Sequence, residues 1–294
     1  MIRFMRAHGL GNDYLVIDLS STLLRLTPGS IQLLCDRHFG VGGDGLLLRW
    51  PSTRADFGVR IFNPDGSEAE KSGNGLRIFA RYLFEMGWLA SRGSIETVGG
   101  VVQAEIHAGS TGTVEVSVDM GHATFRSHEI LLEFNGPKEI DLELPLPDGH
   151  IIGTALSIGN PHFVSFVQDT ARIPLETLGP LIERHPWFPN RTNVQFAQIL
   201  APDRVRVRIW ERGAGVTLAS GSSACAVVAA GVKTGRLGRA VRVEMDGGTL
   251  EVSVDAEGLI RQRGPVVVIA TGELSGELER LLEQCPDSAP SSSP

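Results

Sequence analysis

Ser-Gly-Asn-Gly at residues 72–75 and Ser-Gly-Ser-Ser at residues 220–223 decide the fold, because they are two copies of one element 148 residues apart. Much of the surrounding sequence repeats at the same offset without a gap. The aligned segments are Gly11-Asn12 with Gly159-Asn160, Arg60–Asn63 with Arg208–Glu211, and Glu96…Gly100 with Glu244…Gly248. A shared period in several segments indicates an internal duplication, in which each half of the chain forms the same structural unit.

Hydrophobic periodicity predicts the same order of elements in both halves. Each half has a strand, an amphipathic helix, two strands, a helix that begins after the serine, and a hairpin with a Gly-Gly turn. The predicted fold is α+β, with two pseudo-symmetric lobes, each a mostly antiparallel rolled sheet around a central helix. The expected boundaries are 1–120 with 266–285 returning to that lobe, 121–265 for the second lobe, and 286–294 for a disordered Pro/Ser-rich tail.

Composition and charge exclude several classes of function. Hydrophobic residues make up 42% and charged residues 21% of the 294 residues, which is typical of globular proteins. The net charge of −7 argues against a nucleic-acid or anionic-membrane surface. No signal peptide and no membrane span are predicted, so we expect a cytoplasmic protein. Three distant cysteines do not form a disulfide framework, and His8 and His38 lack metal-ligand spacing, so no metal is expected.

The two Ser-Gly pairs indicate anion binding. Serine is a good helix N-cap, and glycine allows a ligand to approach the backbone. Free N–H groups at a helix start bind carboxylate or phosphate. Each pair alone is also explained as an ordinary N-cap. Because the element occurs twice at matched positions, we expect the two starts to bind one shared small anionic ligand.

Other polar residues lie close to these elements in the repeat. Glu211 and Arg212 end a strand before the second serine and could hold an ammonium and a carboxylate, although an ordinary surface ion pair explains them too. His162 is expected near the second anion site, with a purely structural role as the alternative. Five asparagines lie in glycine-rich or strand-end loops, where turn formation also explains them: Asn12, Asn63, Asn74, Asn160 and Asn193. Gly40–Gly45 matches G-x-G-x-x-G but follows a helix and opens a strand, so it indicates a turn rather than a dinucleotide site.

Together these motifs resemble the diaminopimelate epimerase family over nearly the whole chain. The motifs that carry the resemblance are His8-Gly-Leu-Gly-Asn-Asp13, Asn63-Pro-Asp-Gly-Ser-Glu-Ala-Glu70, Gly73-Asn-Gly, Gly159-Asn-Pro-His162, Thr192-Asn-Val-Gln-Phe196 and Glu211-Arg-Gly-Ala-Gly215. The resemblance implies an epimerase without cofactor that interconverts LL- and meso-diaminopimelate in lysine biosynthesis. In the family, two cysteines on opposite sides of the substrate Cα remove and return the proton. Homodimers are common in the family, and the sequence leaves the oligomeric state open.

The resemblance also assigns roles to residues by position. The positions of the two catalytic cysteines are Ser72 and Ser220 here. His162 and Glu211 correspond to residues that tune the acid/base groups. Residues at substrate-contact positions are Asn12, Asn63, Gly73, Asn74, Asn160, Asn193, Glu211, Arg212, Gly221 and Ser222. Further departures from the common pattern are Gly45, Lys71, Val216 and Ser223.

Serine in place of both cysteines leaves three hypotheses open. A serine hydroxyl is a much weaker acid than a thiol, so almost no alkoxide exists at neutral pH without a strong neighbouring base. The first hypothesis is a working epimerase of diaminopimelate or a related amino acid. The second is an amino-acid-binding protein without turnover, or a family member of altered chemistry such as water elimination. The third is a deliberate replacement of both cysteines, against which the further departures argue.

Overall fold

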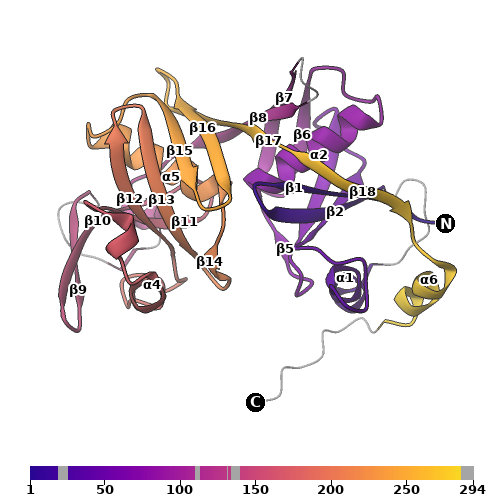
Figure 1. Ribbon diagram of the computed structural model, residues 1–294, viewed down its shortest axis with the longest axis horizontal. Helices are drawn as coiled ribbons and strands as arrows, with labels where there is room; N and C mark the ends of the chain where they lie inside the picture. The colour runs from indigo at the N-terminus through magenta and orange to yellow at the C-terminus, as the bar shows by residue number, and fades with distance from the viewer. Residues whose placement is uncertain (19–25, 110–112, 131, 134–139, 286–294) are drawn as a thin grey trace. The chain divides into compact units, whose positions relative to one another are not determined.

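The computed structural model describes residues 1–18, 26–109, 113–130, 132–133 and 140–285. The chain divides into two compact units, Met1–Val118 together with the chain from Pro265 onward, and Asp119–Gly264. Both units combine strands with helices, which confirms the α+β class (Figure 1). The tail expected at 286–294 lies outside the described residues.

In the first unit, sheet strands in the order β18-β1-β2-β3-β4-β6-β7-β8 surround helix α2, and the short β5 also pairs with β4. The pairings β2–β3 and β4–β6 are parallel and the others are antiparallel. The elements are β1 (Arg3–Gly9), β2 (Asn12–Asp18), α1 (Pro28–Cys35), β3 (Leu46–Trp50), β4 (Phe57–Phe62), β5 (Glu68–Ala69), α2 (Gly73–Glu85), β6 (Arg92–Thr97), β7 (Gly100–Ala108), β8 (Val114–His122), β18 (Val267–Glu273) and α6 (Gly276–Glu283).

The second unit has the same strand order, β9-β10-β11-β12-β13-β15-β16-β17, and again two parallel pairings, β11–β12 and β13–β15. Its elements are α3 (Ser127–Ile130), β9 (Leu142–Leu146), β10 (Gly149–Ser157), β11 (Pro161–Phe166), the 3₁₀ helix η2 (Thr170–Arg172), α4 (Leu175–Glu183), β12 (Asn193–Ala201), β13 (Arg204–Glu211), β14 (Gly215–Thr217), α5 (Gly221–Lys233), β15 (Ala240–Met245), β16 (Gly248–Val254) and β17 (Leu259–Pro265).

Strand register repeats at the offset that the sequence shows. Leu15 pairs with Leu46 in the first unit, and Phe163 pairs with Val194 in the second, each residue 148 positions later. The pairings β3–β4, β4–β5, β4–β6 and β6–β7 recur with the same shift as β12–β13, β13–β14, β13–β15 and β15–β16. Because a slip of one residue would turn every side chain to the other face, equal register places corresponding side chains in equivalent surroundings.

The two central helices are built alike. Serine caps each at its start, as the sequence predicts, and a glycine with positive φ ends each (Gly87, φ 71°; Gly235, φ 69°). In both cases the N–H groups at the end fold back to carbonyls of the last turn, in the Schellman arrangement. Helix α2 contacts β1, β2 and β7, and α5 contacts β10, β11, β12 and β16. Every residue of α5 from Ser223 to Gly231 is buried, which confirms the expectation from its apolar composition.

Helix α1 differs from the sequence expectation at its start. The amphipathic pattern predicts a helix over Ile31–Arg37, whereas α1 begins at Pro28. Thr27 and Ser30 form a capping box there, in which the hydroxyl of each residue accepts the backbone N–H of the other residue. Proline at the first helical position is compatible with that cap, because its missing N–H would have no helical partner.

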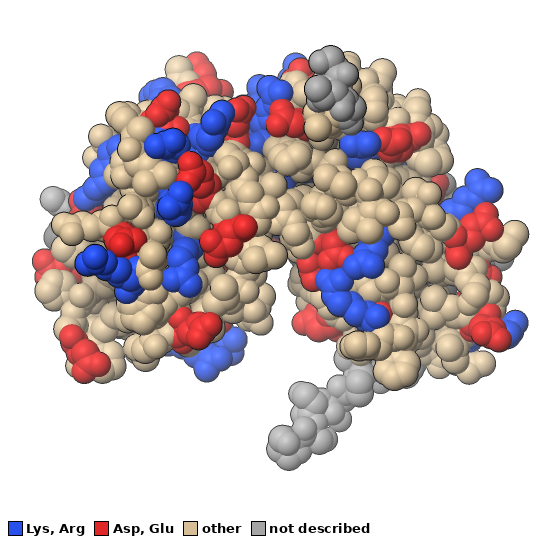
Figure 2. Space-filling view, viewed as in Figure 1, with Lys and Arg blue, Asp and Glu red and all other residues tan. Residues whose placement is uncertain are grey.

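On the face drawn in Figure 2, basic and acidic side chains are interspersed over both units. Such mixing gives no extended field of one sign on that face. Among the described residues, no helix has the length and apolar character needed to cross a membrane.

Candidate active site

Ser72 and Ser220 hold the same position and backbone conformation in their units. Their φ/ψ angles are −137°/119° and −137°/122°. The Ser72 hydroxyl accepts the N–H of Gly75 at 3.1 Å, and the Ser220 hydroxyl accepts the N–H of Ser223 at 3.4 Å. Each hydroxyl therefore lies at the positive end of a helix dipole, which stabilises negative charge on its oxygen.

A glycine follows each serine at the start of its helix. A Cβ at Gly221 would lie 2.4 Å from Oε1 of Gln262, whose side chain is fully buried. The backbone of α5 is thus in close contact with β17, and any side chain at position 221 would displace one of them. Both Gly73 and Gly221 are buried with their helices.

In the first unit, Asn12 and Asn74 are joined in one hydrogen-bond chain. Nδ2 of Asn74 donates to Oδ1 of Asn12 (3.1 Å), and Nδ2 of Asn12 donates to Asp44 (3.2 Å). The fully buried Arg77 donates to Oδ1 of Asn74 at 2.7 Å. The structure therefore brings together two of the predicted substrate residues and fixes the orientation of both amides.

Charged side chains next to Asn12 stabilise this hydrogen-bond chain. Asp13 is buried and accepts hydrogen bonds from Arg6 and Arg37, while its backbone N–H donates to Asp44. Burial alone would raise the pKa of Asp13, but the bonds from Arg37 and Arg6 outweigh it and hold this pKa below its usual range. Asp13 is therefore ionised at neutral pH and anchors the strand that carries Asn12.

The glycine-rich segment Gly40–Gly45 is a turn, in agreement with the sequence analysis. It follows α1 and leads into β3, and Gly42 has a φ of 85°. A Cβ at Gly40 would lie 1.8 Å from the Leu33 carbonyl oxygen, so only glycine fits. The function of this turn in the site is to present Asp44 to Asn12.

Asn63 lies in a separate turn after β4. Its side chain donates to Ser67 at 3.0 Å, and its backbone N–H donates to the Ser67 carbonyl. This is the ordinary turn role that the sequence analysis left open. Asn63 is exposed, and its position at the end of β4 corresponds to Glu211 at the end of β13.

In the second unit, His162 is fully buried and bonded through both ring nitrogens. Nε2 of Gln195 donates to Nδ1 of His162 at 3.0 Å, so Nδ1 carries the lone pair and Nε2–H donates to Asn160 (2.9 Å). The same Gln195 amide donates to the Ser223 hydroxyl at 3.0 Å. The pKa of His162 is lowered to about 3, chiefly by burial; the Gln195 bond acts to raise this pKa, and the nearby Arg212 charge acts to lower it.

These contacts define what His162 can do. At neutral pH the ring is uncharged, and the lone pair that would accept a proton is occupied by Gln195. His162 therefore acts as a hydrogen-bond donor to the Asn160 side-chain oxygen, and this bond orients the Asn160 amide. It does not act as a free general base in this arrangement.

Replacing His162 by glutamine is expected to make the free energy of unfolding depend less on pH below about pH 6.5. An unfolded histidine has a pKa of about 6.5, so between that pH and about pH 3 the unfolded chain binds a proton that the native protein rejects. The contribution of neutral His162 is fully present above about pH 6.5 and decreases toward pH 3, by about 1.4 kcal/mol per pH unit. Urea unfolding at neutral pH and at about pH 5 measures this slope.

His185→Gln is the matched control for that measurement. Burial lowers the pKa of His185 as well, but this side chain is only partly enclosed, so its variant should flatten the profile less. Parallel profiles for His162→Gln and the unaltered protein would contradict the assignment of a neutral buried ring.

The turn after β13 begins with Arg212, next to Glu211 at the end of the strand, and Asn193 is bonded to it. Nδ2 of Asn193 donates to the Pro161 carbonyl (2.9 Å) and Oδ1 accepts the N–H of Arg212 (3.0 Å). The Arg212 guanidinium donates to the Asn190 carbonyl, and Glu211 accepts from Thr217 at 2.8 Å. Glu211 and Arg212 are thus each held by a different neighbour.

Several residues that shape the site were missed by the sequence analysis. Glu183 is buried on α4 and accepts from the indole of Trp210 (2.8 Å) and the N–H of Gly213 (3.0 Å), which fixes the turn carrying Arg212. Gln195 links His162 to Ser223. Glu183 gives no periodic signal in one sequence, whereas Gln195 lies within the quoted motif Thr192–Phe196 but was given no role there. Tyr14, whose hydroxyl lies 3.1 Å from the Ser72 hydroxyl, could have been found from the repeat.

The described residues contain no group of three or more histidine, cysteine or acidic side chains that could hold a metal ion. Cys35 and Cys225 are buried thiols, and Cys285 is partly exposed. Burial raises the pKa of Cys35 to about 12, which makes it a poor nucleophile.

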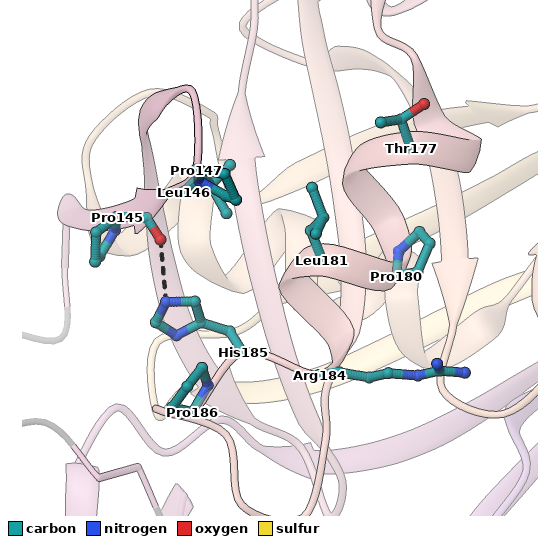
Figure 3. A pocket seen from close by; sticks show the side chains of 9 residues that line it. All are labelled: Pro145, Leu146, Pro147, Thr177, Pro180, Leu181, Arg184, His185 and Pro186. Carbon is teal, nitrogen blue, oxygen red and sulfur yellow. Dashed lines mark hydrogen bonds between the residues drawn. The ribbon is translucent and has the colours of Figure 1, made fainter.

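A cavity of about 680 Å³ in the second unit lies away from these residues, and none of them lines it. Figure 3 shows it between the β9–β10 turn and α4, with walls of proline and leucine side chains. The ring of His185, which also lines the cavity, donates to the Pro145 carbonyl (3.0 Å). The cavity offers few polar groups for recognising an amino acid.

Comparison with known proteins identifies the relatives of the chain. The sequence profile described as diaminopimelate epimerase matches residues 4–126 and 154–269. The chain is 46% identical over 277 residues to the diaminopimelate epimerase of Pelotomaculum thermopropionicum, covering 92% of this chain and 98% of that protein. It is 45% identical to diaminopimelate epimerase 2 of a Nostoc species, covering 94% and 97%.

Solved structures share the fold at low identity. A hydroxyproline epimerase of Agrobacterium vitis, solved with bound trans-4-hydroxy-L-proline, aligns with a TM-score of 0.69 and 16% identity, over 92% of this chain and 91% of that one. A phenazine biosynthesis protein of Bacillus anthracis aligns with a TM-score of 0.66 and 18% identity, over 93% and 99%. At such identity the likeness extends to the fold alone.

Proposed function

Because this chain belongs to the diaminopimelate epimerase family, we propose that it is an amino-acid epimerase that interconverts LL- and meso-diaminopimelate in lysine biosynthesis. The relatives named for this activity match over 98% and 97% of their own length, which supports the proposal. The reaction inverts one Cα centre by removing its proton on one face and adding a proton on the other.

Ser72 and Ser220 are the proposed acid/base groups, and their matched N-cap geometry carries this proposal. In one direction a serine oxygen takes the Cα proton while the other serine gives its proton to the resulting carbanion. In the reverse direction the roles exchange. The backbone N–H at each helix start and the helix dipole favour the form in which the oxygen bears negative charge.

Backbone N–H groups and polar side chains, rather than the residues at the two cysteine positions, are proposed to bind the substrate. The N–H groups following the capping serines at Gly73, Gly221 and Ser222 are suited to a carboxylate, since the first N–H groups of a helix have no helical partner. Asn12, Asn74, Asn160 and Asn193 supply amides, and their orientations are fixed by the bonds described above. Glu211 and Arg212 are proposed for an ammonium and a carboxylate, and Asn63 for a further polar contact.

The test is deuterium exchange at Cα. Purified protein is incubated in D2O with LL-diaminopimelate, and the Cα signal is followed by NMR while calorimetry measures affinity. We expect exchange that is slow compared with thiol-based relatives, because two hydroxyls are weaker acids. Tight binding without exchange over hours would instead indicate an amino-acid-binding protein.

Single replacements assign the exchange to the two serines. Ser72→Ala and Ser220→Ala should each abolish detectable exchange, and each should cost about 1 kcal/mol of stability through loss of a cap. Ser275→Ala is the matched control, because Ser275 caps α6 in the same way, accepting from Leu278 at 3.2 Å. It should show the same stability cost with unchanged exchange, and equal exchange in all three variants would refute the assignment.

The proposed reaction also suggests a setting. Lysine and cell-wall precursors are made in the bacterial cytoplasm, so a cytoplasmic location follows from the proposal. Light scattering on the purified protein would decide between a monomer and the homodimer common in the family.

A further inference from the structure

Tyr14 lies against the proposed catalytic serine of the first unit. Its hydroxyl is 3.1 Å from the Ser72 hydroxyl, within hydrogen-bonding distance, and either oxygen can donate. The ring belongs to the core cluster of this unit and only 7% of the residue is exposed. A tyrosine held in a core with its hydroxyl on a functional serine is fixed in direction as well as in place.

Gly45 makes room for this ring. A Cβ at Gly45 would lie 2.5 Å from Cε1 of Tyr14 and 2.6 Å from the Phe62 carbonyl oxygen. No side chain fits there without moving the ring away from its place. Gly45 and Tyr14 are therefore one local arrangement, which directs the phenol at Ser72.

The duplication gives Tyr14 a counterpart in the other unit. Tyr14 is 148 residues before His162, and the neighbouring pairs Leu15–Leu46 and Phe163–Val194 show that strand register is equal at this point. Equal register places Tyr14 and His162 at equivalent positions in their sheets. The contacts differ, since His162 bonds to Gln195, which bonds to Ser223, whereas Tyr14 reaches Ser72 directly.

Building on the epimerase function proposed above, we propose that Tyr14 is a positioning residue that exchanges a proton with Ser72 during turnover. When Ser72 gives its proton to the Cα carbanion, the Tyr14 O–H bond breaks and its proton passes to the Ser72 oxygen. The electron pair of the carbanion forms the new Cα–H bond, and the negative charge rests on the Tyr14 phenolate. In the opposite direction each proton moves back, so no further reactant is needed.

This relay removes the main chemical difficulty of serine as the base at Ser72. Without it the negative charge would rest on an alkoxide, whereas a phenol has a pKa of about 10 and holds the charge at much lower cost. The N–H of Gly75 remains bonded to the Ser72 oxygen and fixes the position of that oxygen. A positioned acid/base group typically contributes about 100-fold or more to turnover.

Tyr14→Phe keeps the ring and removes the hydroxyl. With diaminopimelate as substrate, we expect kcat for Cα exchange to fall about 100-fold while KM changes less than about threefold. The pH profile of kcat/KM should lose the ionisation that Tyr14 contributes. Tyr82→Phe is the matched control, because Tyr82 is the other tyrosine of the chain, is 8% exposed and belongs to the same core cluster. Its kcat should stay within about threefold, and an equal loss in both variants would overturn the proposal.

A second pair of variants separates a relay from loss of structure. In the Ser72→Cys background the thiol has its own accessible pKa, so adding Tyr14→Phe should cost less than about fivefold in kcat. If the phenol only supports packing, its removal should cost the same factor in both backgrounds. An equal cost would therefore overturn the relay even if Tyr14→Phe is slow.

An absence of Cα exchange in the unaltered protein would refute the proposed function. The contact between Tyr14 and Ser72 can still be tested in that case, by a measurement that does not depend on turnover. With Tyr82→Phe, Tyr14 is the only tyrosine, and its ionisation is followed by ultraviolet absorbance. Adding Ser72→Ala should then raise the Tyr14 pKa by about half a unit or more, because the phenolate loses a donor. An unchanged titration would show that the two hydroxyls are not coupled, and would reject the proposal.

Discussion

Replacing Ser72 and Ser220 together by cysteine is expected to raise turnover of diaminopimelate at least about 100-fold. A thiol has a pKa of about 8.5, and position at a helix N-terminus lowers it further, so a useful fraction is thiolate at neutral pH. Both serines lie at such positions with matching backbone angles, so the replacement places each sulfur where the oxygen now is. The backbone and amide groups proposed to bind substrate are present within each unit and do not change with this replacement.

The two replacements should act together rather than independently. One group must remove a proton while the other returns one, so a single Ser72→Cys or Ser220→Cys leaves the slower hydroxyl in the path. We expect each single variant to gain less than about tenfold, and the pair to exceed the product of the two gains. Deuterium exchange at Cα and steady-state epimerisation measure both quantities.

Ser275→Cys is the control for nonspecific thiol effects, because it places a cysteine at the N-cap of α6. It should leave turnover unchanged. Cysteine is a weaker cap than serine, so all four variants should lose a little stability. If the double variant binds diaminopimelate tightly but gains no turnover, the missing thiols are not what limits this protein, and the binding-protein hypothesis is favoured.

The sequence predicted the fold because the duplication is preserved residue by residue. An offset of 148 fixes the two serines, the glycines that end α2 and α5, and the register of five strand pairings at once. Such agreement between local signals and long-range pairing leaves few alternative folds. Helix α1 was misplaced at its start, since its capping box, Thr27 with Ser30, lies before the amphipathic stretch.

The site was predictable only where it repeats or matches a family motif. Asn12 and Asn74 were expected as substrate contacts, but their bond to each other depends on a contact between β2 and α2 that no single sequence reveals. The protonation state of His162 depends on complete burial and on Gln195, which is distant along the chain. Tyr14 had a signal in the repeat, but its partner at Ser72 is set by three-dimensional packing.

Arg77→Met is expected to weaken both stability and amino-acid binding. Arg77 is fully buried at one end of the hydrogen-bond chain and donates to Asn74, which in turn donates to Asn12. Methionine fills much of the space but offers no donor, so the Asn74 carbonyl oxygen loses that bond inside the protein. Loss of a charged buried hydrogen bond is expected to lower the free energy of unfolding by roughly 2–3 kcal/mol. Arg77→Ala adds a cavity and should cost roughly 3–5 kcal/mol.

Affinity distinguishes the role of Arg77 in the site from its role in the core. Arg81 lies on the same helix, and its side chain is 14% exposed and bonded to Glu85 and the Val266 carbonyl, away from Asn74. Arg81→Met should therefore lower stability in urea while leaving the calorimetric Kd for diaminopimelate unchanged. For Arg77→Met we expect Kd to rise about tenfold, because the freed Asn74 amide no longer holds Asn12 in one orientation. Equal affinities in both variants would show that Asn12 is held by Asp44 alone.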